Sequence, residues 1–224
     1  MEIKSVGVVG AGQMGNGIAH VMAVAGYDVV LNDLNAEALE RAMTVIDKNL
    51  DRQVSRNIIS ADDKAASLAR ISSTQELTEL GQCDLIVEAA TEREEIKTKI
   101  FETLVPHLKP NTILTSNTSS ISITRLASRT DRPEKFMGFH FMNPVPVMQL
   151  VELIRGIATD QETYQACLKV VEDLGKTAAS AEDFPAFIVN RILMPMINEA
   201  VYTLYEGVGN VSSIDQAMKL GANH

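Results

Sequence analysis

Short apolar runs alternate with longer stretches of mixed polarity over the first two thirds of the chain. Runs rich in β-branched residues predict strands at 5–9, 28–32, 84–87, 112–115 and 136–141. Between them, the spacing of apolar positions predicts helices at 16–25, 36–55, 62–69 and 94–105. Strands separated by helices pair in parallel through right-handed crossovers, so the pattern predicts a doubly wound α/β sheet.

The pattern changes near Phe184 and Pro185. From 187 to 205 the chain is apolar on most faces, which is typical of a helix that packs against other helices. We therefore divide the chain into an α/β domain over 1–183 and the beginning of an all-helical second domain over 184–224.

Composition narrows the class of protein. The chain has 224 residues, 46% of them hydrophobic, and a formal net charge of -9, which repels phosphate backbones and argues against nucleic acid as a partner. Cys83 and Cys167 lie far apart and fit neither a disulfide framework nor a metal site, so we expect no metal and a reducing compartment. No apolar run approaches the ~18 residues of a membrane span, and glycines interrupt the apolar N-terminus. We expect a cytoplasmic protein that does not enter a membrane.

A glycine-rich turn follows the first predicted strand and opens a helix. Gly10 permits the tight turn, Gly12 allows the backbone to approach a pyrophosphate, and Gly15 allows close packing of helix on strand. The free N–H groups and the dipole of the helix N-terminus can then hold phosphates without a basic surface. The turn predicts a Rossmann-type domain whose cofactor-binding residues include Gly10, Gly12, Gln13, Met14 and Gly15.

The second predicted strand leads into Asp33, near the distance from the glycine turn at which an acidic residue accepts hydrogen bonds from the adenosine ribose. A 2′-phosphate would meet this carboxylate, and the next residues, Leu34 and Asn35, carry no positive charge. We therefore predict NAD rather than NADP. The alternative is an ordinary glycine turn beside a surface aspartate.

His140 falls at the carboxyl end of the strand predicted at 136–141, the edge at which open α/β sheets bind ligands. Imidazole suits a group that takes a hydroxyl proton and returns it near neutral pH. Glu152 could fix the tautomer of this ring and stabilise its charged form. A lone histidine is more often structural, however, and its place at a strand end only makes the two interpretations even.

Six segments, in order along the chain, resemble the 3-hydroxyacyl-CoA dehydrogenase family and most of all its short-chain 3-hydroxybutyryl-CoA members. They are the glycine turn, 87–90, 116–120, 140–152, 187–191 and 218–221. The resemblance implies reversible, NAD-dependent oxidation of a (3S)-3-hydroxyacyl-CoA, with 3-hydroxybutyryl-CoA as the expected substrate. It also implies a homodimer for the full-length family.

The resemblance assigns the catalytic roles to four residues. His140 is the general base towards the alcohol and the general acid towards the ketone, and Glu152 pairs with its far nitrogen. Ser119 bonds the reacting oxygen, and Asn190 orients the substrate carbonyl as a fixed dipole. Ser119 could instead belong to an ordinary turn, and Asn190 could be a helix cap.

Further positions match cofactor and substrate contacts of the family. The resemblance places these residues near NAD: Glu92, Lys97, Asn117, Ser119 and Asn143. It makes the helical hairpin at about 36–69 a cover for CoA, with Arg56 facing the CoA phosphates. For Glu92, Lys97 and Arg56 the alternative is a solvated charge on a helix surface.

Two departures weaken the match. Ala186 stands where family members commonly have glycine, and relatives continue past His224 with helices that complete the second domain. We therefore expect an incomplete helical domain whose apolar residues are exposed. Two other functions stay open: oxidation of a different hydroxy acid, such as a gulonate-type sugar acid, and a non-catalytic NAD-binding relative.

Overall fold

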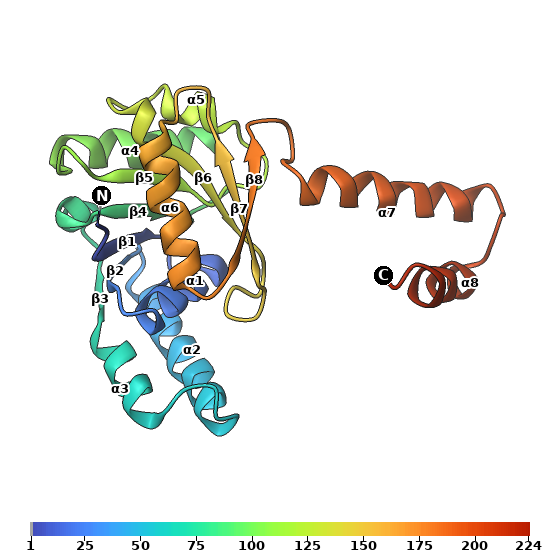
Figure 1. Ribbon diagram of the computed structural model, residues 1–224, viewed down its shortest axis with the longest axis horizontal. Helices are drawn as coiled ribbons and strands as arrows, with labels where there is room; N and C mark the ends of the chain where they lie inside the picture. The colour runs from blue at the N-terminus through green and yellow to red at the C-terminus, as the bar shows by residue number, and fades with distance from the viewer. Residues whose placement is uncertain (1) are drawn as a thin grey trace. The chain divides into compact units, whose positions relative to one another are not determined.

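An eight-stranded mixed sheet organises the chain, of which the computed structural model describes residues 2–224 (Figure 1). The strands are β1 (Ser5–Val9), β2 (Asp28–Asn32), β3 (Ile71–Thr74), β4 (Leu85–Glu88), β5 (Ile113–Ser116), β6 (Phe136–Phe141), β7 (Leu150–Arg155) and β8 (Thr177–Glu182). Their order in the sheet is β3-β2-β1-β4-β5-β6-β7-β8. The chain winds outwards from β1 in both directions, which confirms the predicted Rossmann-type doubly wound sheet.

Two sequence expectations about the sheet are wrong. β7 runs antiparallel to β6, whereas the other neighbouring strands are parallel as expected. The sequence pattern also misses β3, β7 and β8. β3 and β8 are edge strands with mostly small and polar side chains, so pairing with a neighbour, and not intrinsic strand preference, stabilises them.

Helices cover both faces of the sheet. They are α1 (Gln13–Val24), α2 (Ala36–Ser55), α3 (Ala61–Ala69), α4 (Glu94–Leu104), α5 (Ile123–Ala127) and α6 (Gln161–Asp173). Short helical turns lie at Leu77–Gln82, Val105–His107 and Pro133–Lys135. α1 begins three residues earlier than expected because Gly12 is its N-cap, and α2 and α3 form the predicted hairpin. α5 and α6 lie outside the predicted helices.

Alternate side chains of the strands build two apolar layers. Val6 and Val8 of β1 pack in one cluster with Ile18 of α1 and Val170 of α6. On the opposite face, Phe101 of α4 meets Phe136 of β6 edge to face, with ring centroids 5.0 Å apart. Burying one such aromatic side chain contributes roughly 1.5–3 kcal/mol, so these layers hold the strand ends in fixed positions.

The chain divides into two compact units, Met1–Pro185 and Ala186–His224. The second unit contains α7 (Val189–Tyr205), α8 (Val211–Gln216) and a terminal π-helix (Ala217–Gly221). Among the described residues α7 has no buried side chain, which agrees with the expectation of exposed apolar residues in the second domain and not with close packing of this helix against others. Its apolar side chains are exposed instead, among them Ile192, Val201 and Tyr205.

The second unit begins with two residues in the left-handed region of backbone space. Ala186 has φ +66° and Phe187 has φ +53°. Glycine adopts this conformation freely, whereas a side chain makes it unfavourable. The departure from the family pattern at Ala186 therefore falls where the missing glycine would relieve backbone strain.

Among residues 2–224, no helix has the length and apolar character needed to cross a membrane. Over the same residues, no three or more His, Cys, Asp or Glu side chains come together in a group that could hold a metal ion.

Candidate active site

The glycine turn between β1 and α1 has the geometry that close approach to a ligand requires. Gly10 has φ +99°, and its N–H donates to the Asn32 carbonyl at 2.7 Å. A Cβ placed on Gly15 would lie 1.7 Å from the Gly10 carbonyl oxygen, so only glycine allows α1 to start there. A Cβ on Gly12 would meet no atom within 4 Å. The chain therefore leaves open space beside Gly12.

Asp33 lies directly after β2 and faces this turn. Its Oδ2 accepts from the Ala11 N–H at 2.8 Å, and its Oδ1 accepts from the Asn35 N–H at 2.9 Å. A hollow of about 370 Å³ adjoins it, lined by Gly10, Gly12, Gln13, Met14, Asp33, Ala89, Ala90 and Thr91. None of these lining side chains is basic, so a phosphate bound here would depend on backbone N–H groups and the N-terminus of α1.

His140 and Glu152 are partners across the antiparallel pair β6–β7. Residues directly opposite each other in such a pair project from the same face of the sheet, which brings imidazole and carboxylate together. The His140 Nδ1 lies 2.7 Å from Glu152 Oε2, Glu152 is fully buried, and 5% of the His140 surface is exposed. The pairing arises from the antiparallel turn that the sequence pattern does not predict.

Ser119 follows β5 and reaches the other nitrogen of the same ring. Its Oγ lies 3.1 Å from His140 Nε2. With the Glu152 carboxylate accepting a hydrogen bond from Nδ1–H, Nε2 carries the lone pair and accepts a hydrogen bond from the Ser119 hydroxyl. The ring is thereby oriented with a basic nitrogen beside a half-exposed hydroxyl, the arrangement that general-base chemistry on an alcohol needs.

Two asparagines connect the strand ends. Asn117 accepts from the Phe141 N–H through Oδ1 at 2.8 Å and so holds the segment after β5 against the end of β6. Asn143 accepts from the Gln13 side chain at 3.1 Å, which joins the segment after β6 to the first turn of α1. The glycine turn and the His140 segment are thus tied directly to each other.

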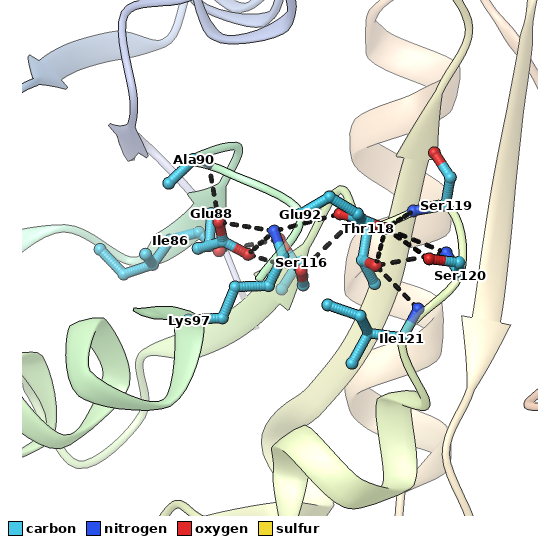
Figure 2. Close-up of polar contacts among 11 residues, drawn as sticks. Ile86, Glu88, Ala90, Glu92, Lys97, Ser116, Thr118, Ser119, Ser120 and Ile121 are labelled. Atoms are coloured by element: carbon cyan, nitrogen blue, oxygen red, sulfur yellow. Dashed lines mark hydrogen bonds and ion pairs between the residues drawn. The ribbon is translucent and has the colours of Figure 1, made fainter. Parts of the chain in front are cut away.

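Lys97 is buried, so its alternative interpretation as a solvated charge is wrong. Only 1% of its surface is exposed, and its ammonium lies 2.8 Å from both carboxylate oxygens of Glu88 (Figure 2). Glu92 Oε2 lies 3.6 Å from the same Nζ. Glu88 ends β4 and carries a role that the sequence interpretation misses, although a single carboxylate closing an all-buried strand is a signal that could have revealed it.

Glu92 is half-buried and holds the segment that carries Ser119. Its Oε1 accepts from the Thr118 hydroxyl at 2.5 Å and from the Ser119 and Ser120 N–H groups at 2.9 and 3.1 Å (Figure 2). Burial alone would raise the pKa of this carboxyl. The hydrogen bonds, with the nearby Lys97 ammonium, outweigh burial and hold the pKa below its usual range. Glu92 therefore stays ionised near neutral pH.

The remaining predicted residues lie at different places. Arg56 follows α2 and lines a hollow of about 540 Å³ together with Arg52 and with Pro144, Pro146 and Val147 of the segment after His140. Asn190 is the second residue of α7, in the second unit, and its role stays a prediction.

Comparison with known proteins places the chain in a family. Residues 5–184 match the sequence model described as 3-hydroxyacyl-CoA dehydrogenase, NAD binding domain, and residues 187–224 match the C-terminal domain of the same family. A 3-hydroxybutyryl-CoA dehydrogenase of Bradyrhizobium diazoefficiens is 63% identical over 99% of this chain and 76% of that protein. A probable 3-hydroxybutyryl-CoA dehydrogenase of Bacillus subtilis is 48% identical over 100% of this chain and 78% of that protein.

Solved structures agree. The crystal structure of an (S)-3-hydroxybutyryl-CoA dehydrogenase from Ralstonia eutropha superposes with a TM-score of 0.97 and 46% identity, covering 100% of this chain and 79% of that one. Fold, glycine turn and sequence lead to one conclusion: the chain belongs to the 3-hydroxyacyl-CoA dehydrogenase family and is an NAD-dependent oxidoreductase that acts on a CH–OH group.

Proposed function

We propose that this chain catalyses the reversible oxidation of (3S)-3-hydroxybutyryl-CoA to acetoacetyl-CoA with NAD. The observation that carries the proposal is the line of contacts Ser119–His140–Glu152, at 3.1 and 2.7 Å, within reach of the glycine turn through Asn143 and Gln13. Relatives that are 48% and 63% identical bear the name of this activity.

The chain's own residues would divide the proton chemistry among them. His140 takes the hydroxyl proton of the substrate on Nε2, while Glu152 balances the charge that forms on the ring. Ser119 donates a hydrogen bond to the reacting oxygen, and Asn190 would orient the thioester carbonyl. Bound NAD would supply the hydride acceptor. In the reverse direction, the same imidazolium returns its proton to the alkoxide.

The hollow beside Arg52 and Arg56 supports a CoA ester over a free hydroxy acid. It lies between the end of α2 and the segment 144–149, which directly follows the His140 strand. Two guanidinium groups at its wall suit the phosphates of CoA. A gulonate-type acid carries a single carboxylate and no phosphate, so it would use fewer of these charges than a CoA ester.

The substitution His140→Gln tests the proposal. Turnover should fall by about 10²–10⁴-fold, because general-base catalysis is lost. The dissociation constant of NADH, measured by fluorescence titration, should stay nearly unchanged, since His140 is proposed to act on the substrate hydroxyl. His107→Gln, an exposed histidine on a different element, is the control and should behave as the parent.

The assay should compare 3-hydroxybutyryl-CoA with free 3-hydroxybutyrate and gulonate. Parent-like turnover by His140→Gln would disprove the mechanism. Faster turnover of a free acid than of the CoA ester would disprove the substrate class, and NADH binding without turnover of any of them would favour a non-catalytic relative. We also propose that the protein forms a homodimer and lies in the cytoplasm.

A further inference from the structure

A cluster of alternating charges lies next to the proposed catalytic residues and contacts one of them, Ser119, at its backbone N–H. Lys97 stands between two carboxylates, Glu88 at 2.8 Å and Glu92 at 3.6 Å (Figure 2). Glu92 in turn binds the segment 117–121, which we call the Ser119 loop. The catalytic roles assigned above make no use of Glu88, although it is a fully buried ionisable group.

The Glu88 carboxylate accepts hydrogen bonds from three residues: Ala90, Lys97 and Ser116. Its Oε1 accepts from the Ala90 N–H and from Lys97, each at 2.8 Å. Its Oε2 accepts from Lys97 at 2.8 Å and from the Ser116 hydroxyl at 2.6 Å. One carboxylate therefore joins the end of β4, the first turns of α4 and the end of β5.

Ser116, which donates to Glu88, also accepts a hydrogen bond from the Ser119 loop, and the other N–H groups of the loop bond to Glu92 or to Thr118. The Thr118 N–H donates to Ser116 Oγ at 3.3 Å, and the N–H groups of Ser120 and Ile121 donate to Thr118 Oγ1 at 3.3 and 3.0 Å. With the bonds to Glu92, each backbone N–H from Thr118 to Ile121 has an acceptor. Glu88 contacts two groups on which these acceptors border: Ser116, which is itself an acceptor, and Lys97, which lies 3.6 Å from Glu92.

We propose that Glu88 is a positioning residue for the dehydrogenase reaction: its buried carboxylate holds Lys97 and Ser116 so that Glu92 fixes the Ser119 loop beside His140. Removing the charge of Glu88 leaves Glu92 as the nearest carboxylate to the buried ammonium, which draws Glu92 away from the loop N–H groups. An amide in place of the carboxylate also has one acceptor oxygen for donors that now use two. Ser119 then loses its fixed distance to His140.

The test compares three variants of the full chain: Glu88→Gln, Ser116→Ala and the control Thr115→Val. Thr115 is the matched control because its buried hydroxyl also bonds across from β5 to β4, to the Ile86 carbonyl at 2.8 Å, without touching the cluster. Hydrogen–deuterium exchange is measured for the Ser119 loop and for β1 as an internal reference. Turnover is measured on the same samples.

We expect loop exchange to rise at least about tenfold relative to β1 in Glu88→Gln, and to a smaller extent in Ser116→Ala, as local opening becomes easier. Turnover should fall by up to about 10²-fold, because small misplacements of a catalytic group are costly. Thr115→Val should match the parent in both readouts. A purely structural role would instead raise exchange in the loop and in β1 alike.

Unchanged loop exchange in Glu88→Gln and Ser116→Ala, or an equal rise in β1, overturns the proposal. If Glu88→Gln does not fold, loop exchange in Ser116→Ala decides the test, because this variant loses the bond to Glu88 but keeps the Lys97–Glu88 ion pair. The proposal rests on the proposed function only for its effect on turnover. A parent without activity towards any hydroxyacyl-CoA would refute that function while the exchange result still tests the role of Glu88.

Discussion

At the scale of single residues, two glycines of one turn differ in what surrounds them, and this difference separates folding from binding. Gly15 has the Gly10 carbonyl oxygen where a Cβ would go, whereas Gly12 faces open space. Gly12 has φ -68° and ψ -166°, a conformation that alanine adopts without strain. The fold itself requires glycine at position 15, whereas nothing within the described chain requires it at position 12, which is where a bound pyrophosphate is proposed to lie.

Gly15→Ala should therefore destabilise the protein by about 3 kcal/mol or more, because the backbone must move to admit the methyl group. Gly12→Ala should lower the free energy of unfolding by no more than about 1 kcal/mol, the usual effect of alanine at a helix N-cap. Its affinity for NAD should nevertheless drop by at least about tenfold. Urea unfolding and NADH titration of both variants measure the two effects. Parent-like NADH binding by Gly12→Ala would contradict the assigned position of the pyrophosphate.

Residue type and spacing along the chain anticipate the glycine turn and Asp33. For His140 and Glu152 they leave the structural and catalytic interpretations even, and the family resemblance decides between them. The contacts of Glu88 and the burial of Lys97 are harder to predict from the sequence. Only the folded chain shows that one side chain of the charged first turn of α4 points inwards. Family resemblance supplies the catalytic assignment of Ser119, which an isolated serine among serines and threonines does not reveal.

At the scale of elements, two of the three strands that escape prediction, β3 and β8, are edge strands whose stability comes from pairing with a neighbour. β1, β2 and β4 carry continuous apolar runs, so their sequences indicate buried strands. β8 has the sequence Thr-Ala-Ala-Ser-Ala-Glu and forms because β7 provides a template of hydrogen-bonding groups. The antiparallel turn between β6 and β7 matters most for function, since it alone sets His140 opposite Glu152.

The junction of β1 and β4 offers a prediction about pH. Asp84, just before β4, accepts from the N–H groups of Lys4 and Ser5 and pairs with the Lys109 ammonium. Burial alone would raise the pKa of this carboxyl, but the contacts with Lys109, Lys4 and Ser5 lower it to about 2. The carboxylate therefore stabilises the fold above the unfolded pKa of about 4 and loses this contribution as the pH falls towards 2.

Asp84→Asn should reduce the free energy of unfolding by about 1 kcal/mol at pH 7, a value reduced for partial exposure to solvent. The difference from the parent should shrink steadily between pH 4 and pH 2, followed by urea unfolding across that range. Asp28→Asn, at an exposed carboxylate on β2, is the control. A difference that stays constant over the whole range would mean that the carboxylate charge is not what stabilises this junction.

At the scale of the whole molecule, an acidic chain makes any phosphorylated ligand dependent on local hydrogen-bond donors and local positive charges. With a net charge of -9, the protein as a whole repels anions. The glycine turn compensates with backbone N–H groups, and Arg52 and Arg56 place two positive charges at the hollow beside the His140 segment. Local donors would thus let one chain combine an overall repulsive field with the proposed sites for NAD and a CoA ester.

The two units differ in the source of their stability. The large apolar cluster draws its buried residues from the first unit, whereas no residue of α7 or α8 is buried. A chain ending at Pro185 should therefore fold, with a midpoint of thermal unfolding within about 4 °C of the parent, and should bind NADH with similar affinity. Turnover of the CoA ester should be lost, because Asn190 is removed; the full chain with Asn190→Ala is the control that separates the loss of one amide from the loss of the unit. A shortened chain that aggregates would show that the second unit stabilises the first, and one that keeps parent turnover would remove Asn190 from the proposed mechanism.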